Sequence, residues 1–329
     1  MRQIALDAMG GDHAPEAPVQ AALRVARTTA IAVQLYGDKS RIEPLLGGER
    51  ERIEVIHAPD AVGMGESPRD ALRRRGTSIG LAADAVAAGR AEALVSAGNT
   101  GATLLHAARA IPRLPGVRRA ALAAVHPTLP RPHNPDPFAL LLDVGANLEC
   151  QAEDLVQFAV MGAAYAARIS KVERPSVGLL NIGEEAGKGD RLLREAHERL
   201  RAMPGFHGNV EGRDVPLGVV DVVVCPGILG NVTLKLLESM GELVLGLGED
   251  VFRRRLRWRL GRWLLRGGLA RLHSLVDYTS YGGAPILGFE RMVIKAHGRS
   301  DARALENALK VAAKAVRDDV CGAIDSALR

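Results

Sequence analysis

Short apolar runs alternate with longer amphipathic segments along the whole chain. The apolar runs are rich in Val, Ile and Leu, which is typical of buried β-strands. We predict strands at 4–7, 32–36, 53–57, 93–96, 139–143, 177–181, 219–225 and 292–296. The segments between them repeat apolar residues at helical spacing, most clearly at 17–30, 153–168, 190–203 and 302–320. This alternation predicts an α/β fold with three layers, in which helices cover both faces of a largely parallel sheet.

No composition shift, repeat or low-complexity stretch divides the chain into independent units. The Pro-rich piece at 126–137 is typical of a loop or a connection between subdomains. The length of 329 residues is enough for one large domain or two ordinary ones. We expect residues 1–329 to form a single domain, as one unit or as two interleaved subdomains, with a helical excursion at 232–285.

Composition excludes several classes of protein. Apolar residues make up 47% of the chain and charged residues 25%, which is ordinary for a globular protein and excludes disordered, collagenous and coiled-coil classes. No apolar run approaches the roughly 20 residues of a bilayer span, and no export signal is evident. The three cysteines are too few and too scattered for a disulfide framework or a Cys-rich metal site. We expect a cytoplasmic protein.

The net charge of +5 and the sequence pI near 9.3 favour anionic partners. A phosphate group, an acidic carrier protein and an anionic membrane all suit this bias, and we expect no nucleic-acid partner. The excess of arginine over lysine also has a neutral explanation in a GC-rich coding sequence.

Glycine and polar residues follow the predicted strands, where parallel sheets bind their ligands. Glycine allows a ligand to approach the backbone closely, and the free N–H groups of a helix's first turn attract anions. Several such loops together predict a site for a phosphate-like ligand. The candidate binding residues are Asp7, Gly10, Gly11, Asp12, Ser96, Gly98, Asn99, Thr100, Gly101, Gly145, Asn147, Gly183, Glu184, Glu185, Gly230 and His297.

Standard cofactor and nucleophile motifs are missing from the sequence. The loop at 183–189 is one residue short of a Walker A motif and lacks its Ser or Thr. No Gly-x-Gly-x-x-Gly follows the first strand, and no Gly-x-Ser-x-Gly offers a serine nucleophile. Asp7, Asp12 and His13 could ligate a metal, but carboxylates at strand ends more often orient a loop. We expect neither a metal nor a cofactor.

In order along the chain, these loops resemble one family closely: the bacterial phosphate acyltransferases, which make acyl phosphate from acyl-acyl carrier protein and inorganic phosphate. The resemblance covers nearly the whole chain. It is carried by the motifs at 7–12, 96–102, 143–147, 181–185 with 188–189, 208–212, 230–235, 281–284 and 295–298. In one departure, Pro226, Gly227 and Ile228 stand where the family usually has Asp-Gly-Phe, which removes a carboxylate and an N–H donor.

The resemblance implies a fold like that of isocitrate and isopropylmalate dehydrogenases and phosphate acetyltransferases, and a homodimer. It implies a role at the entry to phospholipid synthesis, with contact to a downstream glycerol-3-phosphate acyltransferase. It also implies that Lys188 and Asn231 are catalytic. Phosphate is already an anionic nucleophile, so the expected mechanism is its direct attack on the thioester, with Lys188 and Asn231 stabilising the phosphate or the developing oxyanion.

Two other functions stay open at the level of sequence. One is a phosphate acetyltransferase-like enzyme that uses an acyl-coenzyme A. The other is a non-catalytic scaffold for the carrier protein or the membrane, which the departure at Pro226 makes conceivable.

The segment 251–273 is basic and contains both tryptophans of the chain. On one helical wheel its apolar residues form a stripe beside a stripe of arginines. This suits an anionic membrane surface or an acidic partner, and the alternative is a helix pair between subunits. The candidate contact residues are Phe252, Leu256, Arg259, Trp263 and Arg266. We therefore expect peripheral membrane association.

Overall fold

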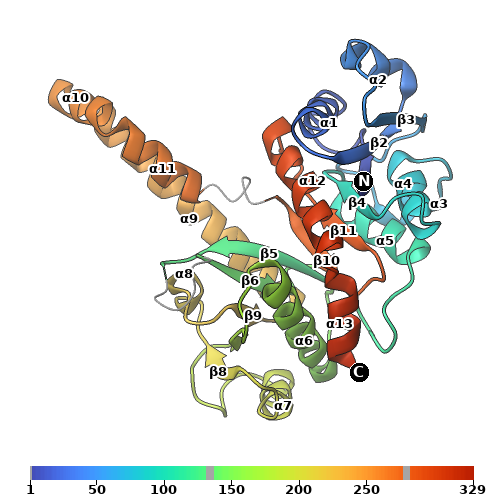
Figure 1. Ribbon diagram of the computed structural model, residues 1–329. Coiled ribbons are helices and arrows are strands. Elements are labelled where there is room, and N and C mark those ends of the chain that lie inside the picture. Colours follow the sequence, from blue (N-terminus) through green and yellow to red (C-terminus); the bar gives the residue numbers. More distant parts are fainter. Residues whose placement is uncertain (1, 131–136, 277–281) are drawn as a thin grey trace.

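The computed structural model describes residues 2–130, 137–276 and 282–329 (Figure 1). Residue 281 of the 281–284 motif, part of the Pro-rich piece and part of the 232–285 excursion lie outside them. The described strands form one 11-stranded sheet in the order β3-β2-β1-β4-β11-β10-β5-β6-β9-β7-β8. Their bounds are β1 Arg2–Asp7, β2 Ile31–Gly37, β3 Ile53–His57, β4 Ala93–Ser96, β5 Ala121–Pro127, β6 Phe138–Leu142, β7 Val177–Leu180, β8 Phe206–Val210, β9 Val222–Val224, β10 Ala284–Leu287 and β11 Met292–Lys295.

The sheet consists of two parallel halves that run in opposite directions. Strands β3, β2, β1, β4 and β11 are parallel to one another, and so are β6, β9, β7 and β8. Between the halves, β10 is antiparallel to β11 and β5, and β5 is antiparallel to β6. The carboxyl ends of the two halves therefore point toward opposite edges, so the predicted strand-end loops do not form one row as they would in a fully parallel sheet.

All eight predicted strands are present, but β5, β8 and β10 were not predicted. Strand β5 is rich in alanine, which has a low preference for strands, and β10 contains Pro285. Strand β8 contains Gly208, whose φ of 118° is accompanied by an irregular register with β7. These strands are held by pairing with their neighbours rather than by a strong local pattern.

Helices cover both faces of the sheet, which confirms the three-layer α/β prediction. Apolar residues alternate along β1: Ile4 and Leu6 pack into the core under α1, α2, α6, α7, α12 and α13, and Ala5 packs into the core under α3, α4, α5 and α8. Figure 1 shows α12 beside α1, and α13 beside α6. The helix bounds are α1 Glu16–Thr28, α2 Lys39–Leu46, α3 Pro68–Arg73, α4 Ser78–Ala87, α5 Thr100–Ala110, α6 Ala152–Ile169, α7 Arg191–Leu200, α8 Asp214–Leu217, α9 Gly227–Arg253, α10 Leu256–Leu264, α11 Arg266–Val276, α12 Ala302–Arg317 and α13 Val320–Leu328.

Helix α12 illustrates how the sequence sets these elements. Asp301 caps its start by accepting a hydrogen bond from the Ala304 N–H at 2.8 Å. Residues such as Leu305, Ala308 and Leu309 recur at helical spacing on its buried face. The predicted helix at 302–320 is divided, because Asp319 adopts a left-handed conformation with φ 48° and caps α13.

Helices α9, α10 and α11 project from the body as a long arm (Figure 1). The interpretation of 251–273 as one continuous helix is wrong, because Arg255 is extended, with φ −136° and ψ 142°, and separates α9 from α10. No residue of α10 is buried, so its leucines, Trp263 and its arginines are all at least partly exposed. In the described part of the chain, no helix combines the length and apolar character needed to cross a bilayer.

Candidate active site

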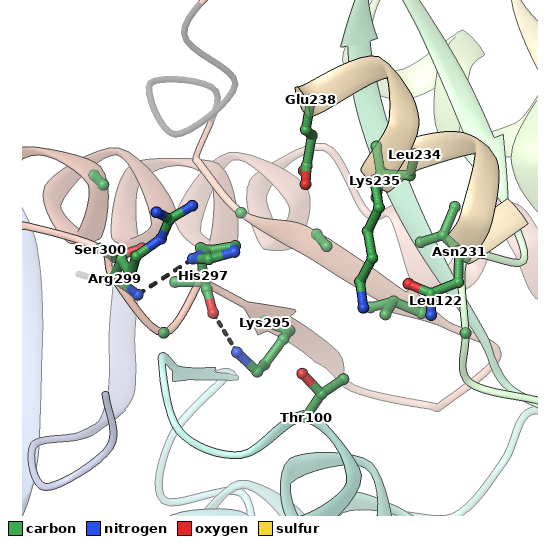
Figure 2. Close-up of a pocket in the computed structure, with 18 of the residues that line it drawn as sticks. Thr100, Leu122, Asn231, Leu234, Lys235, Glu238, Lys295, His297, Arg299 and Ser300 are labelled. Carbon is green, nitrogen blue, oxygen red and sulfur yellow. Dashed lines mark hydrogen bonds between the residues drawn. The ribbon is translucent and has the colours of Figure 1, made fainter. Parts of the chain in front are cut away.

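A cleft of about 640 Å³ lies where the two halves of the sheet meet (Figure 2). One wall comes from the first half, with Thr100 at the start of α5 and the residues that follow β11. The other wall comes from the β6 end and from α9. Apolar residues of β5, including Leu122 and Ala124, lie between the walls. Of the predicted site residues, the cleft is lined by Asp12, Thr100, Gly145, Asn231 and His297.

Asn231 is placed by the close packing of α9 on the loop after β6. A methyl group at Gly230 would collide with the carbonyl oxygen of Asp143, so this approach requires glycine. The same packing brings Gly145 against the Asn231 side chain, whose Cγ would lie 3.5 Å from a Cβ at position 145. The backbone therefore fixes the start of α9 and holds Asn231 at the cleft.

Asp7 lies behind the first wall rather than in the cleft. Its carboxylate accepts hydrogen bonds from the hydroxyls of Ser78 at 2.6 Å and Ser96 at 2.8 Å. Burial raises the pKa of Asp7, and these hydrogen bonds partly offset that rise. The Ser96 hydroxyl also accepts from the Gly98 N–H at 3.0 Å, and a Cβ at Gly10 would lie 2.7 Å from that nitrogen. Asp7 and Ser96 thus join the ends of β1 and β4, and Gly10 and Gly98 let the two loops pack together.

Asn99 and Asn147 also have structural partners. Asn99 caps α5 by accepting from the Ala102 N–H at 3.0 Å, and its amide donates to the carbonyl of Met64 at 2.9 Å. This cap places Thr100 at the cleft. The Asn147 amide donates to the carbonyl of Ala120 at 2.8 Å and to Asp143 at 2.9 Å, which holds the loop after β6.

Two further glycines act at close contacts. Gly11 has φ 103°, a conformation that favours glycine, and the next residue donates its N–H to the Gly298 carbonyl at 2.9 Å. A Cβ at Gly101 would lie only 2.5 Å from Pro68. Both residues therefore set the shape of the loops around the first wall.

The predicted residues Gly183, Glu184, Glu185 and Lys188 do not line the cleft. Because β7 pairs with β9, their loop follows β7 beside the turn that leads from β9 to α9 and Asn231. The Lys188 side chain is 47% exposed, and its Nζ lies 3.8 Å from Glu185 Oε2. Lys188 and Asn231 therefore belong to the same edge of the second half, but only Asn231 reaches the cleft wall.

Two buried asparagines hold the backbone of the Lys188 loop. Asn181 donates to the carbonyl of Lys188 at 3.1 Å, and Asn209 donates to the carbonyl of Glu185 at 2.8 Å. The Asn209 side-chain oxygen lies 2.9 Å from Nδ1 of the buried His197, which donates to it as the Nδ1–H tautomer. The loop is thus positioned from beneath, while the Lys188 side chain stays exposed.

Several cleft residues were missed by the sequence analysis: Lys235, Glu238, Lys295 and Arg299. Lys235 and Glu238 are one helical turn apart on α9 and point into the cleft from one wall (Figure 2). Lys295 ends β11 and Arg299 follows it. Lys295 had been noted only as part of the strand-end motif at 295–298 and was not named as a candidate site residue.

The environment of the cleft shifts the pKa values of several of its side chains. Burial lowers the pKa of Lys295 to about 8. Burial and the nearby Arg299 and Lys295 lower the pKa of His297, which favours its neutral form, and the His297 Nδ1 lies 3.2 Å from the Arg299 N–H. Burial also raises the pKa of Glu238, with Glu242 adding to that rise. Among the described residues, no group of three or more His, Cys, Asp or Glu side chains is suited to hold a metal ion.

Comparison with known proteins identifies the family. A family model described as "Fatty acid synthesis protein" matches residues 2–323. The phosphate acyltransferase of Aquifex aeolicus is 40% identical over 324 residues, which are 97% of this chain and 94% of that protein. The phosphate acyltransferase of Moorella thermoacetica is 43% identical over 326 residues, with 98% and 94% covered.

Solved structures share the fold at low sequence identity. A phosphotransacetylase from Streptococcus pyogenes superposes with a TM-score of 0.65 at 15% identity, covering 96% of this chain and 94% of that one. A 4-hydroxythreonine-4-phosphate dehydrogenase from Klebsiella pneumoniae gives a TM-score of 0.53 at 15% identity, with 96% and 100% covered. The fold is therefore the predicted dehydrogenase-like one. Because the family model and the curated relatives both match almost the entire chain, this protein is a member of the phosphate acyltransferase family of fatty acid synthesis proteins and is an acyltransferase.

Proposed function

We propose that this acyltransferase transfers the acyl group of an acyl-acyl carrier protein to inorganic phosphate and so supplies acyl phosphate for phospholipid synthesis. The observation that carries the proposal is the cleft, where Asn231 and Thr100 offer hydrogen bonds and Lys235 and Lys295 offer positive charge beside the apolar surface of β5. An anion and an acyl chain need these two environments side by side.

The proposed reaction is one displacement at the thioester. A phosphate oxygen attacks the carbonyl carbon and forms a C–O bond, the C–S bond breaks, and the carrier thiolate leaves and takes up a proton. Phosphate is ionised at neutral pH, so the protein has to orient it, remove part of its water shell and stabilise the oxyanion that develops. Asn231 is the proposed amide donor to that oxyanion, because α9 fixes it at the cleft wall.

Lys188 is the proposed second catalytic residue. It lies on the same sheet edge as Asn231, one strand further along, and its exposed side chain suits contact with a thioester that the carrier protein presents from outside. Only the side chain of Lys188 has to contact the thioester in this proposal, because Asn181 holds the Lys188 backbone.

The partners follow the same proposal. The exposed basic and apolar residues of α10 support peripheral contact with an anionic membrane, and the acidic carrier protein and a glycerol-3-phosphate acyltransferase are the proposed protein partners. An exposed apolar stripe along α9 supports a homodimer. It comprises Val232, Leu236, Met240, Leu243, Val244, Leu247 and Val251.

The test is a reaction of the purified protein with palmitoyl-acyl carrier protein and phosphate, in which hydroxylamine traps acyl phosphate. We expect hydroxamate that depends on phosphate. Lys188→Ala is expected to lower kcat by at least 100-fold with an unchanged circular dichroism spectrum, since a charge at a transition state is worth about 3 kcal/mol or more. Lys310→Ala is the matched control, because Lys310 is on α12 and pairs with Glu306 at 2.6 Å.

Other outcomes identify the alternatives. Turnover with acetyl-coenzyme A but not with the carrier thioester would indicate a phosphate acetyltransferase-like enzyme. Tight carrier binding with no loss of thioester would indicate a scaffold, and normal turnover by Lys188→Ala would remove Lys188 from the mechanism.

A further inference from the structure

Lys295 is a buried cation at the base of the cleft. Its side chain ends β11 between the neighbouring strands β4 and β10, and only 6% of the residue is exposed. It nonetheless lines the cleft, beside Thr100 (Figure 2). A charge in such a position has lost most of its water, which is costly unless other groups compensate for it.

The surrounding residues compensate for this charge only in part. The Lys295 ammonium donates a hydrogen bond to the carbonyl of Ala296. Asp7 and Asp12 raise its pKa from a distance, and no carboxylate of the described residues lies within the 4.0 Å of an ion pair. The Asp7 oxygens already accept from Ser78 and Ser96. An ammonium keeps three donors, so this one has capacity for a ligand.

Other charges around the cleft are arranged differently. Lys235 is exposed on α9, and Arg299 forms an ion pair with Glu242 at 3.4 Å. Glu238 has a pKa raised by burial, and His297 has a pKa lowered by burial. Among the described cations of the cleft, Lys295 is therefore the most buried, which makes it the strongest anchor for a small anion.

We propose that Lys295 is a phosphate-binding residue, whose ammonium holds the anionic oxygens of inorganic phosphate at the base of the cleft, between Thr100 of α5 and Lys235 of α9. This inference rests on the proposed function and names the residue that binds its acyl acceptor. Thr100 begins an 11-residue helix, so its hydroxyl and the first N–H groups of α5 are suited to share the anion with Lys295. The acyl chain would then lie along the apolar residues of β5.

The first experiment measures binding of inorganic phosphate directly, by isothermal titration calorimetry at pH 7, to the full-length protein and to Lys295→Met. The substitution keeps the length of the side chain and removes its charge. We expect phosphate affinity to fall about 10- to 100-fold, as is usual for loss of a charge-assisted hydrogen bond. Lys310→Met is the control and should bind phosphate as the unchanged protein does.

Thermal unfolding separates a binding role from a structural one. If Lys295 serves the ligand, Lys295→Met without phosphate should have an unchanged or higher Tm, because the cost of burying the charge is removed. It should also lose the rise in Tm that phosphate causes. A lower Tm with unchanged phosphate affinity would show that Lys295 only balances Asp7 and Asp12, and would overturn the inference.

A second variant, Lys295→Arg, covers the case in which Lys295→Met does not fold. Because burial lowers the pKa of Lys295 to about 8, its charge is present below that pH and is lost above it. The phosphate affinity of the unchanged protein should fall between pH 7.5 and 9, whereas an arginine stays charged and should give a flatter profile. The other titratable or charged groups that face this site are Asp7, Asp12, Lys235, Glu238, His297 and Arg299. Identical profiles would overturn the inference.

Two controls separate this inference from the proposed function. Phosphate binding that requires Lys295, in a protein that forms no acyl phosphate, would support the site and reject the reaction. Acyl phosphate formation with an unchanged KM for phosphate in Lys295→Met would support the reaction and reject Lys295 as the phosphate site. If binding of 4′-phosphopantetheine depends on Lys295 and binding of inorganic phosphate does not, Lys295 binds the phosphate of the carrier's prosthetic group and the inference is wrong.

Discussion

Lys188 and Asn231 are held by the fold in different ways. Asn231 is fixed by direct backbone packing, which only glycine at position 230 allows. Lys188 is exposed, and its place depends on hydrogen bonds from Asn181 and Asn209 to its loop. Asn181 and Asn209, which contact no substrate in the proposed mechanism, therefore control the position of Lys188, which does.

Asn209 provides a test of this support. In Asn209→Ala, the carbonyl of Glu185 and Nδ1 of His197 lose their partner, which should lower the free energy of unfolding by about 1–3 kcal/mol. We also expect kcat to fall at least several-fold with little change in the KM for phosphate, because the loop shifts and the cleft does not. Asn209→Asp keeps the acceptor for His197, loses the donor to Glu185 and adds a buried carboxyl group. If both variants lose stability and keep kcat, Asn209 supports the fold alone.

At the residue scale, the sequence predicted which loops lie near the cleft better than it predicted what each residue in those loops does. Asp12, Thr100, Gly145, Asn231 and His297 were predicted and do line the cleft. Other strand-end residues, such as Asp7, Ser96 and Asn147, bind neighbouring loops instead. A polar residue at a strand end can bind a ligand or hold a neighbouring loop. Which of the two it does depends on its burial and its hydrogen-bond partners, which the sequence pattern does not contain. Lys295 was not named as a candidate site residue, because its burial at the base of the cleft is likewise not visible in the sequence pattern.

At the scale of elements, local pattern was sufficient where a segment is both apolar and long. The helices α1, α6, α7 and α12 were predicted, and so were the strands of both parallel halves except β8. The arm was not predicted correctly in detail, because the break at Arg255 interrupts a segment whose composition favours a helix throughout. The break separates α10 from α9 and gives the apolar and basic residues of α10 an orientation of their own.

The exposure of α10 leads to a prediction about membranes. Trp263 is 59% exposed, and the guanidinium carbon of Arg266 lies 5.5 Å from its ring centroid. In Trp263→Glu, an apolar contact is lost and a negative charge is added, so binding to vesicles that contain phosphatidylglycerol should fall at least 10-fold in a co-sedimentation assay. Trp258→Glu tests whether the effect belongs to position 263. Equal binding by the unchanged protein and Trp263→Glu would remove α10 from the proposed contact.

At the scale of the whole molecule, the cleft is a product of strand order. The residues of the first wall follow β4 and β11, and those of the second follow β6 and β9. Only the short strands β10 and β5 separate the two halves, and residues of both sets line one cleft between them. The sequence predicted a largely parallel sheet but not its reversal, because β5 and β10 have weak strand patterns of their own. The position of Lys188 outside the cleft follows from the same order, since β7 is one strand beyond β9.

The exposed stripe on α9 makes the final prediction, which concerns assembly. Its residues recur every three or four positions, and Leu236, Met240 and Val244 are 61%, 49% and 63% exposed. An apolar stripe of this length on a projecting helix is typical of a surface that a second copy covers. Met240→Glu, in the middle of the stripe, places a charge in the proposed interface and should halve the mass measured by light scattering after gel filtration.

Glu249→Gln is the matched control for this prediction. Residue 249 lies on the same helix but outside the stripe, where Glu249 pairs with Arg253 at 3.3 Å, so this change should leave the mass unchanged. Because α9 also carries Asn231 and Lys235 into the cleft, separation of the copies should loosen that wall and lower turnover together with mass. A dimer that persists in Met240→Glu would mean that the copies associate through another surface and that the stripe serves a different partner.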